Sequence, residues 1–313
     1  MSMALVFDTG LALLLVAIGG WVIAARDTFT AVIIYVVYGL LMSLAWVRLS
    51  AVDVALTEVA IGSGITGMLL LNAAARLATA QPEAIRPPFT LRVLAGVLCA
   101  MISAGLALLV TMPSSVAPSL APIAMAHLAE TGLGNPVAGV LFAYRALDTL
   151  LEKIVLVLGL LGVWSLAPDR LWGGTPIMRS YAQPNSILVF LAQVLPPIGI
   201  VFGIYMTWTG ADYPGGAFQG GTVVAAMWLL VMMAGVLRAP AIGEVRVRLA
   251  LVAGPMVFLT IGFAGFVLAD GFLAYPAGYA KPLIVVIEFM LALSIGATLG
   301  MLAVGPPERI EQQ

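Results

Sequence analysis

The sequence predicts an all-α protein, a polytopic transmembrane helix bundle of about nine helices. Of its 313 residues, 62% are hydrophobic and only 9% are charged, and the mean hydropathy is +1.10. This composition is typical of polytopic membrane proteins and not of soluble domains. The apolar residues also gather in long runs, and a helix of roughly 20 apolar residues is long enough to cross a bilayer. Composition and run length together predict the fold class.

Nine apolar runs follow one another along the chain. They lie at about 5–25, 28–47, 52–76, 90–111, 136–166, 185–208, 215–237, 249–268 and 281–303. If the loops alternate across the membrane, one side holds Arg26, Arg76, Arg86, Arg92, Arg170, Arg179, Arg238, Arg246, Arg248 and Arg309, and the other holds only Arg48. Because cytoplasmic loops are enriched in Arg and Lys, we expect a multi-pass protein of the cell inner (plasma) membrane. Its N-terminus would be outside and its C-terminus in the cytoplasm.

The polar, turn-rich stretch 167–184 is the best candidate for a boundary between modules. It predicts a five-helix module at 1–180 and a four-helix module at 181–313. The first four residues include no basic side chain, so we expect the first apolar run to be a retained helix and not a cleaved signal.

The composition also excludes several kinds of chemistry. The one cysteine, Cys99, falls inside an apolar run, and the one histidine, His127, falls in a Pro-rich loop. Disulfides, zinc sites, Cys-ligated iron–sulfur clusters and Ser-His-Asp catalysis therefore lack their parts. We expect no cofactor and no metal site, and no basic, aromatic-interleaved surface suggests nucleic acid.

The third run places Glu58 about two turns into the membrane, whereas Asp53 can stay near the outer surface. An intramembrane glutamate predicts a functional site; the alternative is a protonated Glu that hydrogen-bonds across helices. Gly62, Gly64 and Gly67 match the nucleotide-binding pattern G-x-G-x-x-G, but no strand precedes them. They predict close helix packing or a local π-bulge, and beside Glu58 they form a candidate hinge. The alternative is that glycine is simply common in membrane helices.

The fifth run carries four ionisable residues near its centre, which is costly in lipid. Arg145, Asp148 and Glu152 share one helix face, and Lys153 lies about 100° round from Glu152. Two acids one turn apart push their protonation equilibria apart, and the flanking cations decide which acid keeps its proton. This pattern predicts an ion or proton relay. The alternative is a neutralised cluster that only pins neighbouring helices together.

The second module has a glycine-rich turn and a buried acid. Its turn contains Pro214, Gly215, Gly216, Gly220 and Gly221. Such backbone could expose carbonyls to a cation or could form a tight turn with a packing face at GxxxG spacing. In the last run, Glu288 lies two turns in, with Lys281 at the outer end, and we interpret it as we interpret Glu58.

These motifs resemble those of a known family, the Mrp-type multisubunit cation/proton antiporters. The sequence Arg145-x-x-Asp148-Thr149-x-x-Glu152 is similar to the R-x-x-D-T-x-x-E motif near the C-terminus of their large subunit, MrpA. Residues 28–76 resemble the three-helix region before it, which is itself similar to helices of a small membrane-arm subunit of complex I. Residues 185–304 resemble a second subunit of the same antiporters, MrpB.

Two features depart from the family pattern. MrpA and MrpB are ordinarily separate chains, and the large antiporter-like domain of MrpA has no counterpart here. Ala211-Asp212 also stand where MrpB has a Gly-His-Asn-type lead into its Pro-Gly-Gly turn, so an imidazole role at this turn is in doubt.

The resemblance implies a membrane subunit of an Mrp-like antiporter that exchanges Na⁺ or another monovalent cation for H⁺. Its partners would be antiporter-like pumping subunits and small helical subunits. From the residues themselves, the ion or proton path candidates are Glu58, Asp148, Glu152 and Glu288, and the charge-tuning candidates are Arg145, Lys153 and Lys281. Alternatives are a membrane-arm subunit of a redox-driven, membrane-bound hydrogenase-like complex, or a non-conducting scaffold.

Overall fold

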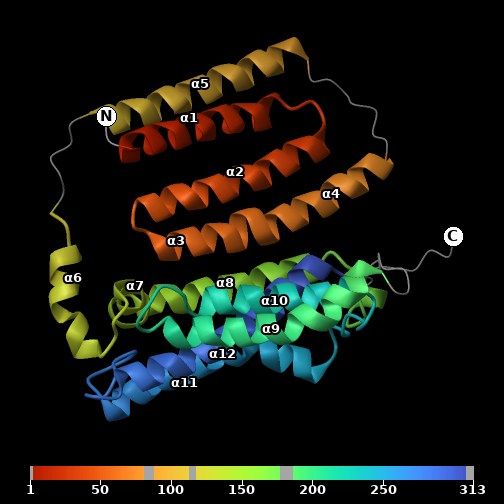
Figure 1. The fold of residues 1–313 in the computed structure, drawn as a ribbon. Coiled ribbons are helices and arrows are strands. Elements are labelled where there is room, and N and C mark those ends of the chain that lie inside the picture. Colours follow the sequence, from red (N-terminus) through yellow and green to blue (C-terminus); the bar gives the residue numbers. More distant parts are fainter. Residues whose placement is uncertain (1–2, 81–87, 113–117, 177–185, 308–313) are drawn as a thin grey trace.

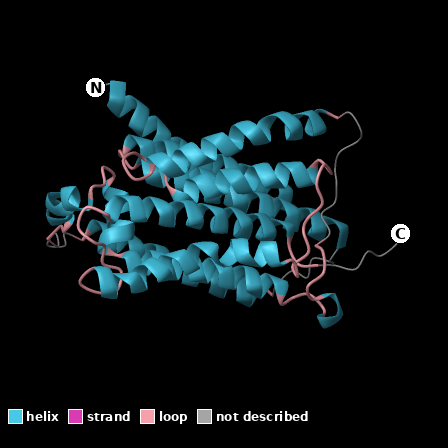
Figure 2. Ribbon diagram, turned by 90° about the horizontal axis from the view of Figure 1, so that it is seen from below, coloured by secondary structure: helices cyan, strands magenta, loops and turns pink. Residues whose placement is uncertain are grey.

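The computed structural model describes residues 3–80, 88–112, 118–176 and 186–307. Within these ranges the chain consists of helices and loops, and no strand occurs (Figure 2). The predicted helix bundle is therefore confirmed for the described part of the chain.

The first five predicted spans correspond to helices with several interruptions. Their bounds are α1 (Met3–Ala24), α2 (Thr28–Arg48), α3 (Val52–Thr57), the π-helix η1 (Glu58–Thr66), α4 (Gly67–Ala80), α5 (Phe89–Thr111), α7 (Pro136–Gly139), the π-helix η3 (Val140–Tyr144) and α8 (Ala146–Trp164). A short helix, α6 (Ala121–His127), and a 3₁₀ turn, η2 (Leu128–Thr131), lie in the loop before α7, and a second 3₁₀ turn, η4 (Asp169–Leu171), follows α8. The third and fifth spans are thus each broken by a π-helix.

The last four predicted spans are regular helices. They are α9 (Ile187–Thr209), α10 (Ala217–Met233), α11 (Val245–Leu268) and α12 (Ala280–Val304). Among the described helices, seven are long and apolar enough to cross a membrane. The helix α10 has only 17 residues, and α8 carries Asp148, Glu152 and Lys153 within 19 residues. The chain is a multi-pass membrane protein, and the predicted count of nine spans is approximate.

Helix starts follow local side-chain chemistry. Asp27 caps α2 by accepting hydrogen bonds from the backbone N–H of Thr30 (2.7 Å) and from its hydroxyl (2.8 Å), as N-cap aspartates do. These bonds hold the pKa of the Asp27 carboxyl below its usual value. Asn135 caps α7 in the same way by accepting from the N–H of Val137 at 2.9 Å.

The helices form two layers (Figure 1): α1 to α4 lie together, and α8 to α12 form a second group. The helix α8 packs on α11 and α12. The fifth predicted span therefore packs within the helices that follow it, and the division at residue 180 remains a prediction about modules.

The core lies around α12, which packs against α8, α9, α10 and α11. Ile284, Ile287 and Leu291 of this helix are fully buried. Close approach depends on small residues, because a Cβ on Gly221 of α10 would lie 2.7 Å from the Ala292 carbonyl oxygen. By contrast, no residue of α1 or α5 is buried. The first layer therefore leaves large apolar faces uncovered by the described part of this chain.

Candidate functional site

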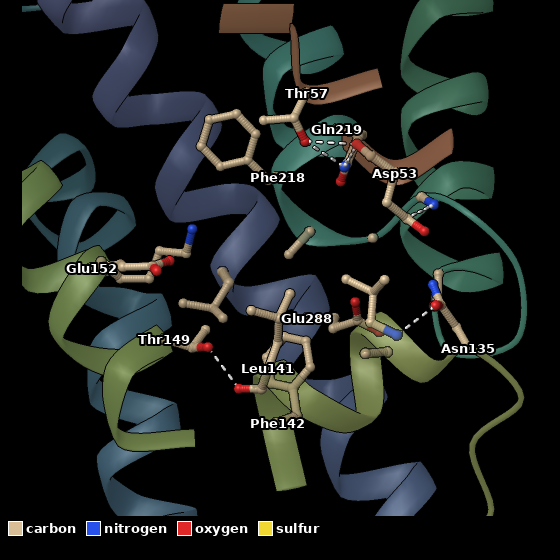
Figure 3. Close-up of a pocket in the computed structure, with 18 of the residues that line it drawn as sticks. Asp53, Thr57, Asn135, Leu141, Phe142, Thr149, Glu152, Phe218, Gln219 and Glu288 are labelled. Atoms are coloured by element: carbon tan, nitrogen blue, oxygen red, sulfur yellow. Dashed lines mark hydrogen bonds between the residues drawn. The ribbon is translucent and has the colours of Figure 1, made fainter. Parts of the chain in front are cut away.

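A cavity of about 390 Å³ lies between the two groups of helices. It is lined by residues from α3, α7, α8, α10 and α12 and from the glycine-rich turn before α10 (Figure 3). The polar side chains in its wall are those of Asp53, Thr57, Asn135, Thr149, Glu152, Lys153, Gln219 and Glu288. The cavity thus gathers acids and amides from positions far apart in the sequence.

Glu288 is the most deeply buried acid in this wall, with 2% of its surface exposed. The backbone N–H of Ala217, the first residue of α10, stabilises its carboxylate electrostatically. Its second oxygen, Oε2, is buried without a hydrogen-bond partner among the described residues. The N-terminus of α10 stabilises negative charge at this position, and the free oxygen leaves room for one further ligand or proton.

Glycine is required beside Glu288. Gly216 has φ +114°, and a Cβ there would lie 2.9 Å from Glu288 Oε1. Gly215 has φ +149°, which side chains also disfavour. The Pro-Gly-Gly turn that the sequence singled out therefore lets the backbone approach the carboxyl. Gly220 and Gly221 serve helix packing instead, since their Cβ positions meet α9 and α12 respectively.

The helix α3 is tied to the same turn. Asp53 Oδ1 accepts a hydrogen bond from the N–H of Gly215 at 2.9 Å, and Gln219 Nε2 donates to Thr57 Oγ1 at 3.1 Å. Sequence reasoning left Asp53 near the outer surface and did not consider Gln219. The structure places both in the cavity wall; the only sequence signal for Gln219 was its position within the glycine-rich motif.

On α8, Glu152 and Lys153 line the cavity. Lys153 is 9% exposed, and its Nζ lies 4.9 Å from the centroid of the Phe218 ring. The helix is interrupted two turns before Glu152, at Arg145, whose φ is −132°. The hydroxyl of Thr149 donates to the Leu141 carbonyl at 2.6 Å and so satisfies a backbone acceptor next to the interruption.

Arg145 and Asp148 lie outside the cavity lining. They form an i, i+3 ion pair at 2.5 Å, with side chains 71% and 48% exposed. The shared face that helix periodicity gave to Arg145, Asp148 and Glu152 is thus divided, because only Glu152 reaches the cavity. The relay role of Asp148 remains a prediction.

Glu58 also lies outside this cavity. It is half-buried at the start of η1, and its carboxylate lies close beside Gly62 and beside Gly39 on α2. Of the alternatives that the sequence left open at these glycines, the π-helical one is present, since residues Glu58–Thr66 form a π-helix. Glu58 therefore faces α2, and its functional role remains a prediction.

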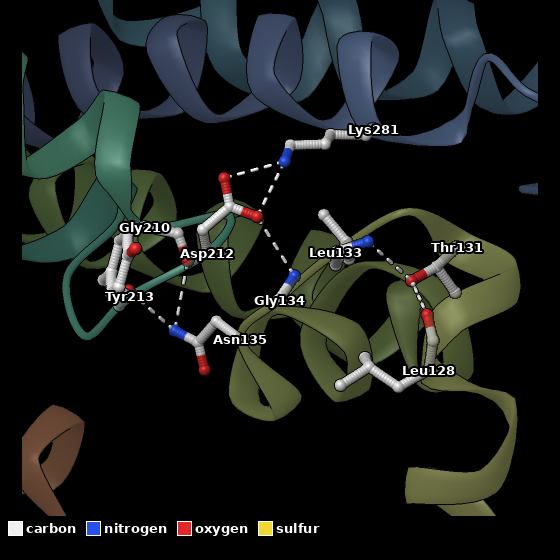
Figure 4. A network of polar contacts seen from close by, with 9 residues as sticks. All are labelled: Leu128, Thr131, Leu133, Gly134, Asn135, Gly210, Asp212, Tyr213 and Lys281. Atoms are coloured by element: carbon white, nitrogen blue, oxygen red, sulfur yellow. Dashed lines mark hydrogen bonds and ion pairs between the residues drawn. The ribbon is translucent and has the colours of Figure 1, made fainter.

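Lys281 is not paired with Glu288. Its Nζ lies 2.7 Å from both carboxylate oxygens of Asp212 (Figure 4). Asp212 Oδ1 also accepts from the N–H of Gly134, and Asn135 Nδ2 donates to the carbonyls of Gly210 and Tyr213. We call this network, formed by Gly134, Asn135, Gly210, Asp212, Tyr213 and Lys281, the turn latch. It fastens the turn before α10 to the start of α7 and to α12.

Comparison with known families divides the chain into two matched regions. Residues 13–79 match the MbhD family, described as the D-type subunit of MBH. Residues 187–305 match the family described as a domain related to the MnhB subunit of Na⁺/H⁺ antiporter.

Two relatives show how much of a larger protein this chain covers. An uncharacterized protein of Methanocaldococcus jannaschii is 28% identical over 176 residues, which is 48% of this chain and 67% of that protein. A putative antiporter subunit, mnhA2, of Staphylococcus aureus is 30% identical over 157 residues, which is 50% of this chain. The match covers only 19% of that antiporter subunit.

Solved structures share the fold. This chain matches part of a chain in the Mrp complex from Dietzia sp. DQ12-45-1b with TM-score 0.71 and 24% identity, over 97% of this chain and 35% of that one. It also matches a chain of the membrane-bound sulfane sulfur reductase (MBS), an archaeal respiratory membrane complex, with TM-score 0.57 and 24% identity, over 68% of this chain and 97% of that one. Residues 13–79 are therefore similar to the MbhD family and residues 187–305 to the MnhB-related domain, which confirms the resemblance to an Mrp-type subunit in which a module like the C-terminal part of MrpA is fused to an MrpB-like module.

Proposed function

We propose that this chain is a membrane subunit of an Mrp-like complex that exchanges Na⁺ or another monovalent cation for H⁺, and that its cavity belongs to the ion path. The observation that carries the proposal is Glu288. This residue is 2% exposed and lines the cavity, and one oxygen of its carboxyl is buried without a partner among the described residues. Ionisable residues at membrane depth mark ion and proton pathways.

The wall of the cavity has the chemistry that cation exchange needs. A carboxylate binds a hard cation through oxygen when ionised and carries H⁺ when protonated. Glu288, Glu152 and Asp53 supply such groups, and Gln219 adds an amide. Because one oxygen cannot hold a proton and a cation together, binding of one favours release of the other.

The remaining parts of the transporter would come from partner subunits. The related antiporter subunit mnhA2 extends far beyond the part that this chain matches. The uncovered apolar faces of α1 and α5 suit packing against other membrane helices. We infer that antiporter-like pumping subunits and small helical subunits bind this chain, with its N-terminus outside and its C-terminus in the cytoplasm.

A second candidate function is a membrane-arm subunit of a redox-driven complex. It is favoured by the match of residues 13–79 to the MbhD family and by the fold shared with the sulfane sulfur reductase chain. In both candidates the chain itself is a transport subunit. In the second, other subunits would carry out the redox reaction. The subunits that co-purify with the chain in mild detergent distinguish the two candidates. Redox subunits among them would identify the redox-driven complex, and small antiporter subunits would identify the antiporter.

The test uses the intact complex in proteoliposomes, with cation-dependent ΔpH as the readout. Glu288→Gln keeps the size of the side chain but cannot release a proton. We expect normal assembly and a loss of exchange of at least about tenfold. Glu130→Gln is the matched control, because Glu130 is exposed in the loop before α7, where it pairs with His127. Normal exchange by assembled Glu288→Gln complex would refute the proposal.

A further inference from the structure

A basic and an acidic side chain line the cavity without forming an ion pair with each other. The ammonium of Lys153 is buried and, among the described residues, makes no ion pair. Glu288 Oε2 is buried in the same wall, also without a partner in the described part of the chain. A buried charge without an opposite partner is costly. The charged form of each group therefore depends on contacts other than a direct ion pair between them.

The first turn of α10 contacts both groups. The backbone N–H of Ala217 stabilises the Glu288 carboxylate electrostatically, and the ring of the next residue, Phe218, faces Lys153 Nζ at 4.9 Å. This distance lies within the range of a cation–π interaction. Two consecutive residues, Ala217 and Phe218, thus contact the carboxyl of Glu288 and the ammonium of Lys153 at one cavity.

We propose that Lys153 is a tethered cation that competes with the transported monovalent cation for Glu288. This inference rests on the proposed function. When a cation occupies Glu288, the lysine is held over Phe218. When the cation leaves, the ammonium moves across the cavity and neutralises the carboxylate.

The chemistry of lysine suits this role. Its ammonium is a compact point charge on a flexible four-carbon stem, whereas the guanidinium of arginine is a rigid planar group. The stem of Lys153 is packed in the protein interior, and the cavity provides space for the head to move. Glu152, the preceding residue, attracts Lys153 electrostatically and lowers the cost of the position over Phe218.

The tethered-cation model predicts opposite effects from two substitutions. Lys153→Met removes the competitor, so the half-saturating Na⁺ concentration for exchange should fall, by up to about tenfold if the lysine occupies Glu288 nine-tenths of the time. Phe218→Leu removes the ring that holds the lysine aside, so the half-saturating concentration should rise. Lys153→Arg keeps the positive charge but replaces the compact ammonium with a planar guanidinium. Phe218→Tyr is the control that keeps an aromatic ring beside the lysine.

The experiment measures Na⁺-dependent exchange by the reconstituted complex and equilibrium binding of radioactive Na⁺ to the purified complex. Opposite shifts from Lys153→Met and Phe218→Leu support the proposal, and the Phe218→Leu shift decides alone if Lys153→Met does not assemble. Unchanged values, or shifts in the same direction, overturn it, because a purely structural lysine would change yield and not Na⁺ affinity. If Glu288→Gln is inactive while Na⁺ affinity is unchanged in both variants, only this inference fails. If Glu288→Gln exchanges normally, the proposed function fails as well.

Discussion

Glu58 and Glu288 look alike in the sequence, but they occupy very different environments. Glu58 begins a π-helix, is half-buried and lies against glycines of its own helix and of α2. Glu288 lies in a regular helix, is 2% exposed, lines the cavity and lies beside the N-terminus of α10. Depth in the membrane therefore does not fix the environment of a carboxyl; the groups that converge on it do.

The largest effect should come from Gly216→Ala. The new Cβ would meet Glu288 Oε1 at a position where φ is +114°, so strain and a clash both act on the cavity. We expect exchange to be lost and the complex to be destabilised by about 1–3 kcal/mol. Gly278→Ala is the matched control, because Gly278 also has a positive φ but nothing described lies within 4 Å of its Cβ position. Thermal stability and exchange of both variants give the comparison, and an active Gly216→Ala complex would contradict it.

A smaller effect is expected from Glu58→Gln. Because Glu58 lies outside the cavity, its neutral isostere should reduce exchange less than Glu288→Gln does. The measurement is the initial rate of cation-dependent ΔpH formation, compared between the two variants at equal amounts of assembled complex. Equal losses would show that the two acids belong to one path and would remove the distinction drawn between them.

Asp212→Asn tests whether the turn latch positions the cavity. The substitution removes the ion pair with Lys281 but keeps an acceptor for the N–H of Gly134. The pair is partly exposed, so we expect a loss of stability of only about 1 kcal/mol. Exchange should fall moderately, because the turn carries Gly215 and Gly216. A rate unchanged at reduced stability would make the latch purely structural.

The smallest effect is expected from Arg145→Gln. Its ion pair with Asp148 is largely exposed and lies outside the cavity, and exposed pairs contribute about 0–1 kcal/mol. Glu152→Gln, two turns further along the chain, changes a cavity residue and should reduce exchange much more. Exchange rates across a pH series compare the two variants. A stronger effect of Arg145→Gln would support a relay in which Arg145, Asp148 and Glu152 act together on one helix face.

Local composition and spacing in the sequence account for several features of the fold. Apolar run length predicted the helices, the glycines near Glu58 indicated a π-bulge as one alternative, and the i, i+3 spacing of Arg145 and Asp148 placed on one helix face two residues that do pair. Each of these depends on residues within a few turns of one another, so helix geometry and burial cost suffice to derive it.

Tertiary packing determines which polar groups meet. Asp53 bonds to Gly215 across 162 residues of sequence, and Lys281 pairs with Asp212 and not with Glu288. Glu288 is stabilised by the backbone N–H of Ala217, a group that every non-proline residue carries and that no sequence pattern marks. Helix periodicity defines the faces of one helix, but the packing of α3, α8, α10 and α12 selects the faces that enclose the cavity.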